Sequence, residues 1–367
     1  MSFAARLESV RQSMKQVGVD CLFLSLGADL PWLSGYEAMP LERLTMLVVP
    51  AGRRATLVVP RLEAPRVEPV PDVFDVRPWS EHEDPVAIVV GLAGAETRRV
   101  AVSDRTWATF VLRLQDAIPG AAWLPSSLIT SPLRAVKDAA EIDALAAASA
   151  AADRVAEQLL AGEIPLVGRT EREVSQDIGR RLIAEGHQKV NFAIVGSGPN
   201  SASPHHEPGQ RVIGAGESVV CDFGGTMNGY CSDITRTVWT GSAEPPAQFR
   251  EMYEVLRRAQ AAGVEAATVG TPCEAVDEAA RGHIVEGGYG EAFIHRTGHG
   301  IGLEEHEDPY IVSGNDAALR PGHAFSVEPG IYLAGRYGAR IEDIVVAADG
   351  GPRSLNAVSR ELTVVDA

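Results

Sequence analysis

The chain has 367 residues, of which 45% are hydrophobic and 22% are charged, the balance of an ordinary folded globular protein. At a usual domain size of about 150 residues, this length gives two or three domains. Acidic side chains (49) outnumber basic ones (33), and the net charge of −16 repels phosphate backbones and anionic lipid surfaces. No apolar stretch reaches the ~18 residues of a membrane span. We therefore expect neither nucleic-acid nor membrane partners.

The amino-terminal residues and the cysteines bear on the compartment. Residues 1–18 carry charges throughout and lack the apolar run of a signal peptide, so a cytoplasmic protein is expected. The cysteines lack the spacing of a zinc or redox site and are too few for a disulfide framework. We expect all four to be reduced and to fill the core: Cys21, Cys221, Cys231 and Cys273.

The amino-terminal third alternates between helical and strand-like patterns. Helices are predicted at 1–18 and at 106–118, the latter ended by Pro119 and Gly120. Short apolar runs predict strands at 21–25, 45–50, 56–60 and 98–103. This alternation predicts a small α/β domain over residues 1–132, followed by a loop at 126–134 that marks the boundary. The domain has no cluster of His, Asp and Glu, so no chemistry is assigned to it.

The second domain, residues 133–367, has strands and helices without strict alternation, which predicts an α+β layout. Helices are predicted at 136–162, 170–186, 245–268 and 271–286. Strands are predicted at 190–195, 218–225, 230–241, 324–328 and 340–347.

One hairpin in this domain brings two acids together. Asn228 and Gly229 are a strong turn signal with strand-like residues on both sides. If they occupy the turn, Asp222 pairs with Thr235. Because side chains alternate along a strand, Asp222 and Asp233 then lie diagonally on one face and their carboxylates converge.

Two converging carboxylates repel each other unless a proton or a cation lies between them. A metal site is one interpretation, and a pair of exposed acids on a solvent face is the other. The apolar neighbours favour burial, whereas a bulge at Gly224–Gly225 would shift the register by one.

A histidine-rich segment follows further along the chain. His295, His299 and His306 fall within twelve residues, and glycines permit close backbone approach around His299. The spacing is not that of the HExxH zinc helix. A histidine here is either a satisfied core residue or a ligand.

Two further acids stand in apolar runs. Glu328 ends the run 324–328, and Glu342 is predicted inside the strand 340–347. A buried carboxylate without a partner is costly, so both need one. Arg340 could pair with one of them, whereas a shared cation cluster would serve the whole set: Asp222, Asp233, His299, Glu328 and Glu342.

The ordered motifs D-x10-D, G-H-G, S-V-E-P-G and R-I-E-D resemble the pita-bread metallopeptidases, and within them the Xaa-Pro branch of prolidase and aminopeptidase P. The match runs from about residue 136 to the end, and the preceding domain is similar to the creatinase-like amino-terminal domain of that branch. The resemblance therefore implies an α/β amino-terminal domain followed by an α+β pita-bread catalytic domain.

The resemblance also implies a role for each candidate residue. Asp222 and Glu328 resemble terminal metal ligands, Asp233 and Glu342 bridging ones, and His299 the imidazole ligand. His205, with His206 as the adjacent alternative, and His306 resemble catalytic histidines, while Glu328 also resembles the proton acceptor. His295 and Arg340 are assigned to substrate binding, with His295 lining the proline-side pocket and Arg340 behind the ligands.

The function implied is hydrolysis of an Xaa-Pro peptide bond by an enzyme with two divalent metal ions. Manganese is the expected metal, with cobalt or zinc as alternatives. The expected substrate is a small peptide with proline at its second position. The compact amino-terminal domain favours a dipeptidase, and an aminopeptidase acting on longer peptides is the alternative. A non-peptidase hydrolase or an inactive binding protein on this fold fits the intact ligand set less well. A homodimer is implied by resemblance alone.

Overall fold

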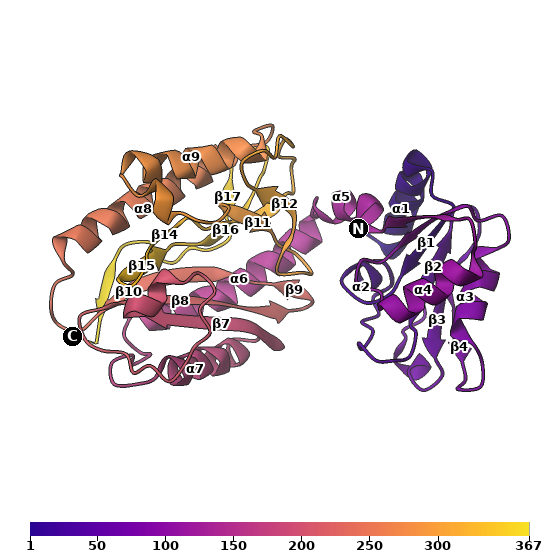
Figure 1. The fold of residues 1–367 in the computed structure, drawn as a ribbon, viewed down its shortest axis with the longest axis horizontal. Coiled ribbons are helices and arrows are strands. Elements are labelled where there is room, and N and C mark those ends of the chain that lie inside the picture. Colours follow the sequence, from indigo (N-terminus) through magenta and orange to yellow (C-terminus); the bar gives the residue numbers. More distant parts are fainter. Residues whose placement is uncertain (367) are drawn as a thin grey trace. The chain divides into compact units, whose positions relative to one another are not determined.

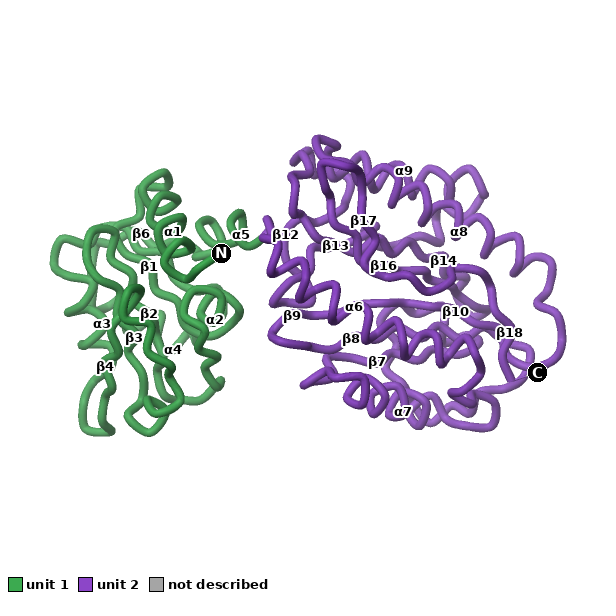
Figure 2. Tube along the Cα trace, turned by 180° about the vertical axis from the view of Figure 1, so that it is seen from behind, with its two compact units in different colours: residues 1–134 green, residues 135–367 purple. Residues whose placement is uncertain are grey.

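The computed structural model describes residues 1–366, and the chain divides into two compact units, Met1–Arg134 and Ala135–Ala367 (Figure 2). The boundary predicted after residue 132 falls inside helix α5 (Ser127–Arg134), the last element of the first unit. The loop predicted at 126–134 is therefore wrong. Its polar residues bind a buried acid: Thr130 Oγ1 and Arg134 Nη1 donate to the Asp29 carboxylate at 2.8 and 2.7 Å.

The first unit is a mixed sheet in the order β4-β3-β2-β1-β5-β6, and its helices include those predicted at 1–18 and 106–118. Strand β2 runs antiparallel to β1 and β3, and the other pairings are parallel. Its strands are β1 (Cys21–Leu24), β2 (Met46–Pro50), β3 (Ala55–Pro60), β4 (Phe74–Trp79), β5 (Arg99–Val102) and β6 (Ala122–Pro125). Besides α5, its helices are α1 (Phe3–Val17), α2 (Asp29–Ser34), η1 (Ala64–Arg66), α3 (Pro85–Ala93) and α4 (Ala108–Ala117), and α1 and α4 are the two predicted ones.

The described residues of the second unit form three sheets, in the orders β18-β10-β8-β7 with β9 on β8, β12-β11-β13-β16-β17, and β14-β15. Its first strands are β7 (Lys189–Ser197), β8 (Ser218–Met227), β9 (Tyr230–Cys231), β10 (Ile234–Thr240), β11 (Gly298–Gly300) and β12 (Glu307–Ile311). The remaining strands are β13 (Ala324–Val327), β14 (Gly330–Leu333), β15 (Tyr337–Arg340), β16 (Asp343–Val346), β17 (Arg353–Ser354) and β18 (Thr363–Val365). Its helices are α6 (Ala139–Leu160), α7 (Glu171–Ala184), η2 (Gly198–Ala202), α8 (Ala247–Ala266), α9 (Cys273–Glu286) and η3 (Gly290–Ala292).

Within this unit the strands lie between two layers of helices (Figure 1). Apolar residues of α6 and α7 pack against β7, β8 and β10 on one side. On the other side α8 packs against β14 and β15, and α9 against β12 and β13. No helix formed by residues 1–366 combines the length and the apolarity that crossing a lipid bilayer requires.

The hairpin formed by β8, β9 and β10 has the predicted register. Asn228 and Gly229 adopt positive φ angles of 51° and 82°, as the two-residue turn demands. Asp222 pairs with Thr235, so no bulge shifts the register of β8 against β10 in this hairpin. Asp222 and Asp233 therefore lie on one face.

Two predicted strands are interrupted at acidic residues. The run 230–241 divides into β9 and β10 at Asp233, and the run 340–347 divides into β15 and β16 at Glu342. The prediction that Glu342 lies inside a strand is therefore wrong. At the second break the buried Arg236 contributes a hydrogen bond, because its Nη1 donates to the Glu342 carbonyl at 2.7 Å as well as to the Thr235 carbonyl in β10 at 2.9 Å.

Candidate metal centre

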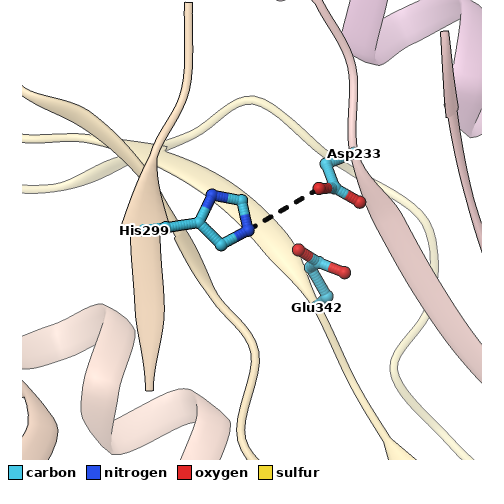
Figure 3. Close-up of side chains that lie close together, drawn as sticks. All are labelled: Asp233, His299 and Glu342. Atoms are coloured by element: carbon cyan, nitrogen blue, oxygen red, sulfur yellow. Dashed lines mark ion pairs between the residues drawn. The ribbon is translucent and has the colours of Figure 1, made fainter. Parts of the chain in front are cut away.

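Three side chains from separate segments converge at one point inside the second unit. Asp233 follows β9, His299 lies on β11, and Glu342 precedes β16; their ligand atoms lie within 4.8 Å of one another (Figure 3). His299 Nε2 is 3.8 Å from Asp233 Oδ2. All three are buried, and Glu342 is only 1% exposed. Such a group of buried donor atoms matches the pattern of a metal site.

The other two predicted ligands border the same space. Glu328 follows β13 and places Oε1 3.2 Å from His299 Nε2. Asp222 lies on β8, and its Oδ2 accepts a hydrogen bond from Arg340 Nη2 at 2.5 Å. All five predicted ligands line one cavity of about 480 Å³. The remaining predicted site residues line it too: His205, His295, His306 and Arg340.

The charges of this cluster are not balanced by the protein. Among residues 1–366, one buried carboxylate oxygen each of Asp222, Asp233 and Glu342 has no hydrogen-bond partner. Burial, followed by repulsion from Glu342 and Asp222, raises the pKa of Asp233 well above its usual value. Burial, followed by repulsion from Glu328 and Asp222, does the same to the pKa of Glu342. Protons or cations must relieve this repulsion.

The donor set fits a pair of divalent ions. Carboxylate oxygens with one imidazole suit manganese and related metals, and four carboxylates balance two divalent charges. The unpartnered oxygens are the atoms to which such ions would bind. The residues present therefore fit the implied metals.

Tight packing around β11 fixes the imidazole. A Cβ on Gly298 would collide with the Ser326 carbonyl oxygen, so a side chain there would push β11 away from β13. His299 Nδ1 lies 3.1 Å from the Gly300 carbonyl oxygen; donation there leaves Nε2 as the free ligand atom. Ser326 Oγ accepts from the His299 amide at 3.0 Å and donates to Glu328 Oε1 at 3.1 Å. One serine thus positions two ligands.

Arg340 lies behind the carboxylates and is itself buried. Besides Asp222, its guanidinium donates to Thr235 Oγ1 at 3.0 Å and to the Tyr332 hydroxyl at 2.8 Å. Thr235 Oγ1 donates in turn to Glu342 Oε2 at 2.7 Å. Thr235 and Tyr332 were not predicted as members of the site. The hairpin register could have indicated Thr235, which pairs with Asp222, whereas nothing marks Tyr332.

The two adjacent histidines of the loop after η2 differ in their surroundings. His205 lines the cavity. His206 instead places Nε2 2.8 Å from Glu171 Oε2. Glu171 is fully buried at the start of α7 and also accepts from the Ser197 amide and hydroxyl. This carboxylate anchors the loop that presents His205, and no sequence pattern marked it.

The pKa values of the two remaining histidines are lowered. Burial, then the neighbouring His299 and Arg296, lower the pKa of His306 to about 4. Its ring centroid lies 3.8 Å from that of His299. Burial also lowers the pKa of His295, whose Nε2 lies 2.9 Å from the Tyr332 hydroxyl. Arg296 Nη2 lies 3.3 Å from His306 Nδ1 and can only donate, so His306 carries its proton on Nε2.

Metallopeptidase family M24 matches residues 134–349, and the creatinase/prolidase N-terminal domain matches residues 6–136. The chain belongs to metallopeptidase family M24. Family M24 enzymes depend on two metal ions, and this M24 chain has its candidate ligands in the cluster described above. The resemblance and the predicted architecture, a creatinase-like domain followed by a pita-bread catalytic domain, are confirmed.

The M24 chain is similar over nearly its whole length to proteins named as dipeptidases. It is 44% identical to a probable dipeptidase PepE of Mycobacterium tuberculosis, covering 99% of this chain and 96% of that one. It is 35% identical to an Xaa-Pro dipeptidase of Lactobacillus helveticus, covering 98% of each. The crystal structure of a Thermococcus sibiricus prolidase superposes with a TM-score of 0.93 at 36% identity over 100% of both chains. An X-Pro aminopeptidase of Thermotoga maritima gives a TM-score of 0.82 at 30% identity, over 96% and 100%.

Proposed function

We propose that this M24 chain is a two-metal Xaa-Pro dipeptidase, which hydrolyses the bond between the first residue and proline. The observation that carries the proposal is the convergence of five ligand-type side chains, with unpartnered carboxylate oxygens, beside one cavity. The names of the relatives support the dipeptide substrate. The similarity to a Thermotoga X-Pro aminopeptidase supports the alternative, release of the first residue from longer peptides.

The metal-binding role belongs to Asp222, Asp233, His299, Glu328 and Glu342 in this proposal. Two manganese ions are preferred, with cobalt or zinc as alternatives, because the donor set is rich in oxygen. When bound, such a pair of ions polarises the scissile carbonyl and makes water a nucleophile near neutral pH.

The other cavity residues bind the substrate and move protons. Glu328, whose carboxylate borders the cavity, accepts a proton from the attacking water. His306, neutral with Nε2–H as its donor, and His205 stabilise the developing oxyanion and protonate the leaving nitrogen. As the C–N bond breaks, the proline nitrogen gains that proton and leaves as a secondary amine, as the nitrogen of any peptide bond must be protonated to leave. His295 lines the proline side, and Arg340 holds Asp222.

The test compares two dipeptides of identical composition. The purified chain is freed of metal with a chelator, reloaded with manganese, cobalt or zinc, and given Ala-Pro or Pro-Ala, with free amino acids measured by chromatography. We expect metal-dependent cleavage of Ala-Pro and little of Pro-Ala. Equal rates on both, or hydrolysis unaffected by the chelator, would rule the proposal out. Ala-Pro-Ala then separates dipeptidase from aminopeptidase.

The domain limits 1–132 and 133–367, the cytoplasmic location and the homodimer stay predictions. Sedimentation velocity of the full chain tests the last of these, and a species with the mass of one chain would contradict it.

A further inference from the structure

Two arginines line the cavity, and their surroundings differ. Arg340 is buried and paired with Asp222. Arg296 precedes β11 and is half-buried, and among residues 1–366 no carboxylate lies within ion-pair distance of it. Glu305, which lines the same cavity, forms no such pair with it. Within the described residues, Arg296 is thus a guanidinium that lines the cavity and takes part in no ion pair.

Neutral aromatic groups hold the Arg296 guanidinium in place. Its Cζ lies 4.4 Å from the centre of the Tyr310 ring on β12, and its Nη2 lies 3.3 Å from His306 Nδ1. Stacking on the ring orients the guanidinium plane, and the single contact to His306 leaves several N–H donors unused. A planar cation held in this way matches a carboxylate, which it can bind with two parallel hydrogen bonds.

We propose that Arg296 binds the free carboxylate that follows the proline and thereby selects dipeptides over longer peptides. This inference rests on the proposed function. The carboxylate carbon of an Xaa-Pro dipeptide lies three bonds from the scissile carbonyl carbon, about 4 Å at most. Arg296 lines the same cavity as the ligands and contacts His306, whose ring centroid lies 3.8 Å from that of the ligand His299, so its guanidinium is near the position where such a carboxylate would lie.

Selectivity follows from the charge. A longer peptide presents a neutral amide where the dipeptide presents a carboxylate. A neutral amide cannot balance the positive charge of the guanidinium once the bound substrate has displaced the water around it. The amide substrate therefore binds more weakly, although the chemistry at the scissile bond is unchanged.

The experiment uses the full-length, manganese-loaded chain with Ala-Pro and with its amide, Ala-Pro-NH2. For the unmodified chain we expect KM to be lower for Ala-Pro by roughly 10- to 100-fold, the range of one charge-assisted pair. Arg296→Gln raises KM for Ala-Pro by that factor and leaves KM for the amide nearly unchanged. The lost contact to His306 affects kcat for both substrates alike, so the ratio of the two KM values is the readout. Arg296→Lys restores part of the preference. Arg258→Gln, on the exposed face of α8, is the charge-matched control and alters neither substrate.

The outcomes separate the inference from the proposed function. If the unmodified chain cleaves neither substrate, the dipeptidase proposal fails. If it cleaves both with equal KM, or if Arg296→Gln leaves the ratio of the two KM values unchanged, Arg296 is not the carboxylate site. A fall in kcat on both substrates with no change in that ratio would assign Arg296 to positioning His306 alone and would overturn the inference.

Discussion

Asp233→Asn is the substitution that most directly tests the charge balance of the site. Asp233 has ligand atoms of His299 and Glu342 within 4.8 Å. At an effective dielectric constant of about 20, two unit charges at that separation repel by roughly 3 to 4 kcal/mol, and partial protonation relieves some of this. Without metal, we therefore expect the variant to be more stable than the unmodified chain by about 1 to 3 kcal/mol at alkaline pH.

The sign of the pH dependence follows from the raised pKa values of Asp233 and Glu342. Between the ordinary carboxyl pKa of ~4 and the raised value, the folded chain binds more protons than the unfolded chain. The stability of the metal-free protein therefore falls as the pH rises through that window. Asp233→Asn removes part of this fall.

Metal reverses the order of the two proteins. An ion at ~1,000 times its dissociation constant stabilises the folded chain by about 4 kcal/mol, and the variant lacks a predicted bridging ligand. Native-state hydrogen exchange of the β8 and β10 amides, with chelator and with manganese, reports the stability of this unit alone. Elemental analysis gives the bound metal. A variant that is less stable without metal, or that gains as much from manganese as the unmodified chain, would refute the reasoning.

Three further predictions concern stability. Burial, then Lys137 and Arg320, lower the pKa of His323 to about 4, so the folded chain loses up to about 3 kcal/mol as the pH falls from ~6.5 to ~4; His323→Gln should flatten this part of the pH profile of unfolding. Gly298→Ala forces β11 away from β13, so it should lower the free energy of unfolding by about 1 to 3 kcal/mol and weaken manganese binding in a titration. The control Gly282→Ala, where α9 has open space, should raise the free energy of unfolding by about 0.5 to 1 kcal/mol. Arg236→Met leaves the charge of Asp343 undercompensated and should cost about 3 to 5 kcal/mol in denaturant unfolding.

Local patterns predicted the main elements and one feature of the site. The Asn228–Gly229 turn fixes the register of β8 against β10, and with it the shared face of Asp222 and Asp233. Strand β11 has only three residues, too few for a periodic pattern, so no strand was predicted there. Helix α5 was taken for a loop because its polar residues bind Asp29, more than a hundred positions earlier.

The site as a whole depends on contacts that no local pattern contains. The residues alone left two interpretations of Asp222 and Asp233 open, a metal site or a solvent-exposed pair of acids. The assignment of all five ligands rested on the resemblance. The choice between His205 and His206 depends on Glu171, which holds His206 from another segment. The Glu342 carbonyl, at the break between β15 and β16, accepts a hydrogen bond from Arg236, more than a hundred positions away. Each of these partners becomes a neighbour only once the chain has folded.

Arg236 also indicates how the site responds when metal is removed. Its guanidinium donates to Asp343 Oδ1 at 2.8 Å and to the carbonyls of Thr235 and Glu342, so it ties together the two segments that carry Asp233 and Glu342. Gln260 also donates to Asp343, at 2.8 Å. These bonds are between protein groups and do not need the ions. Because the backbone of the two carboxylates is fixed in this way, loss of metal leaves the repulsion in place instead of letting the segments move apart. The cluster therefore stays preorganised for cations, at a cost in stability that the metal-free protein bears.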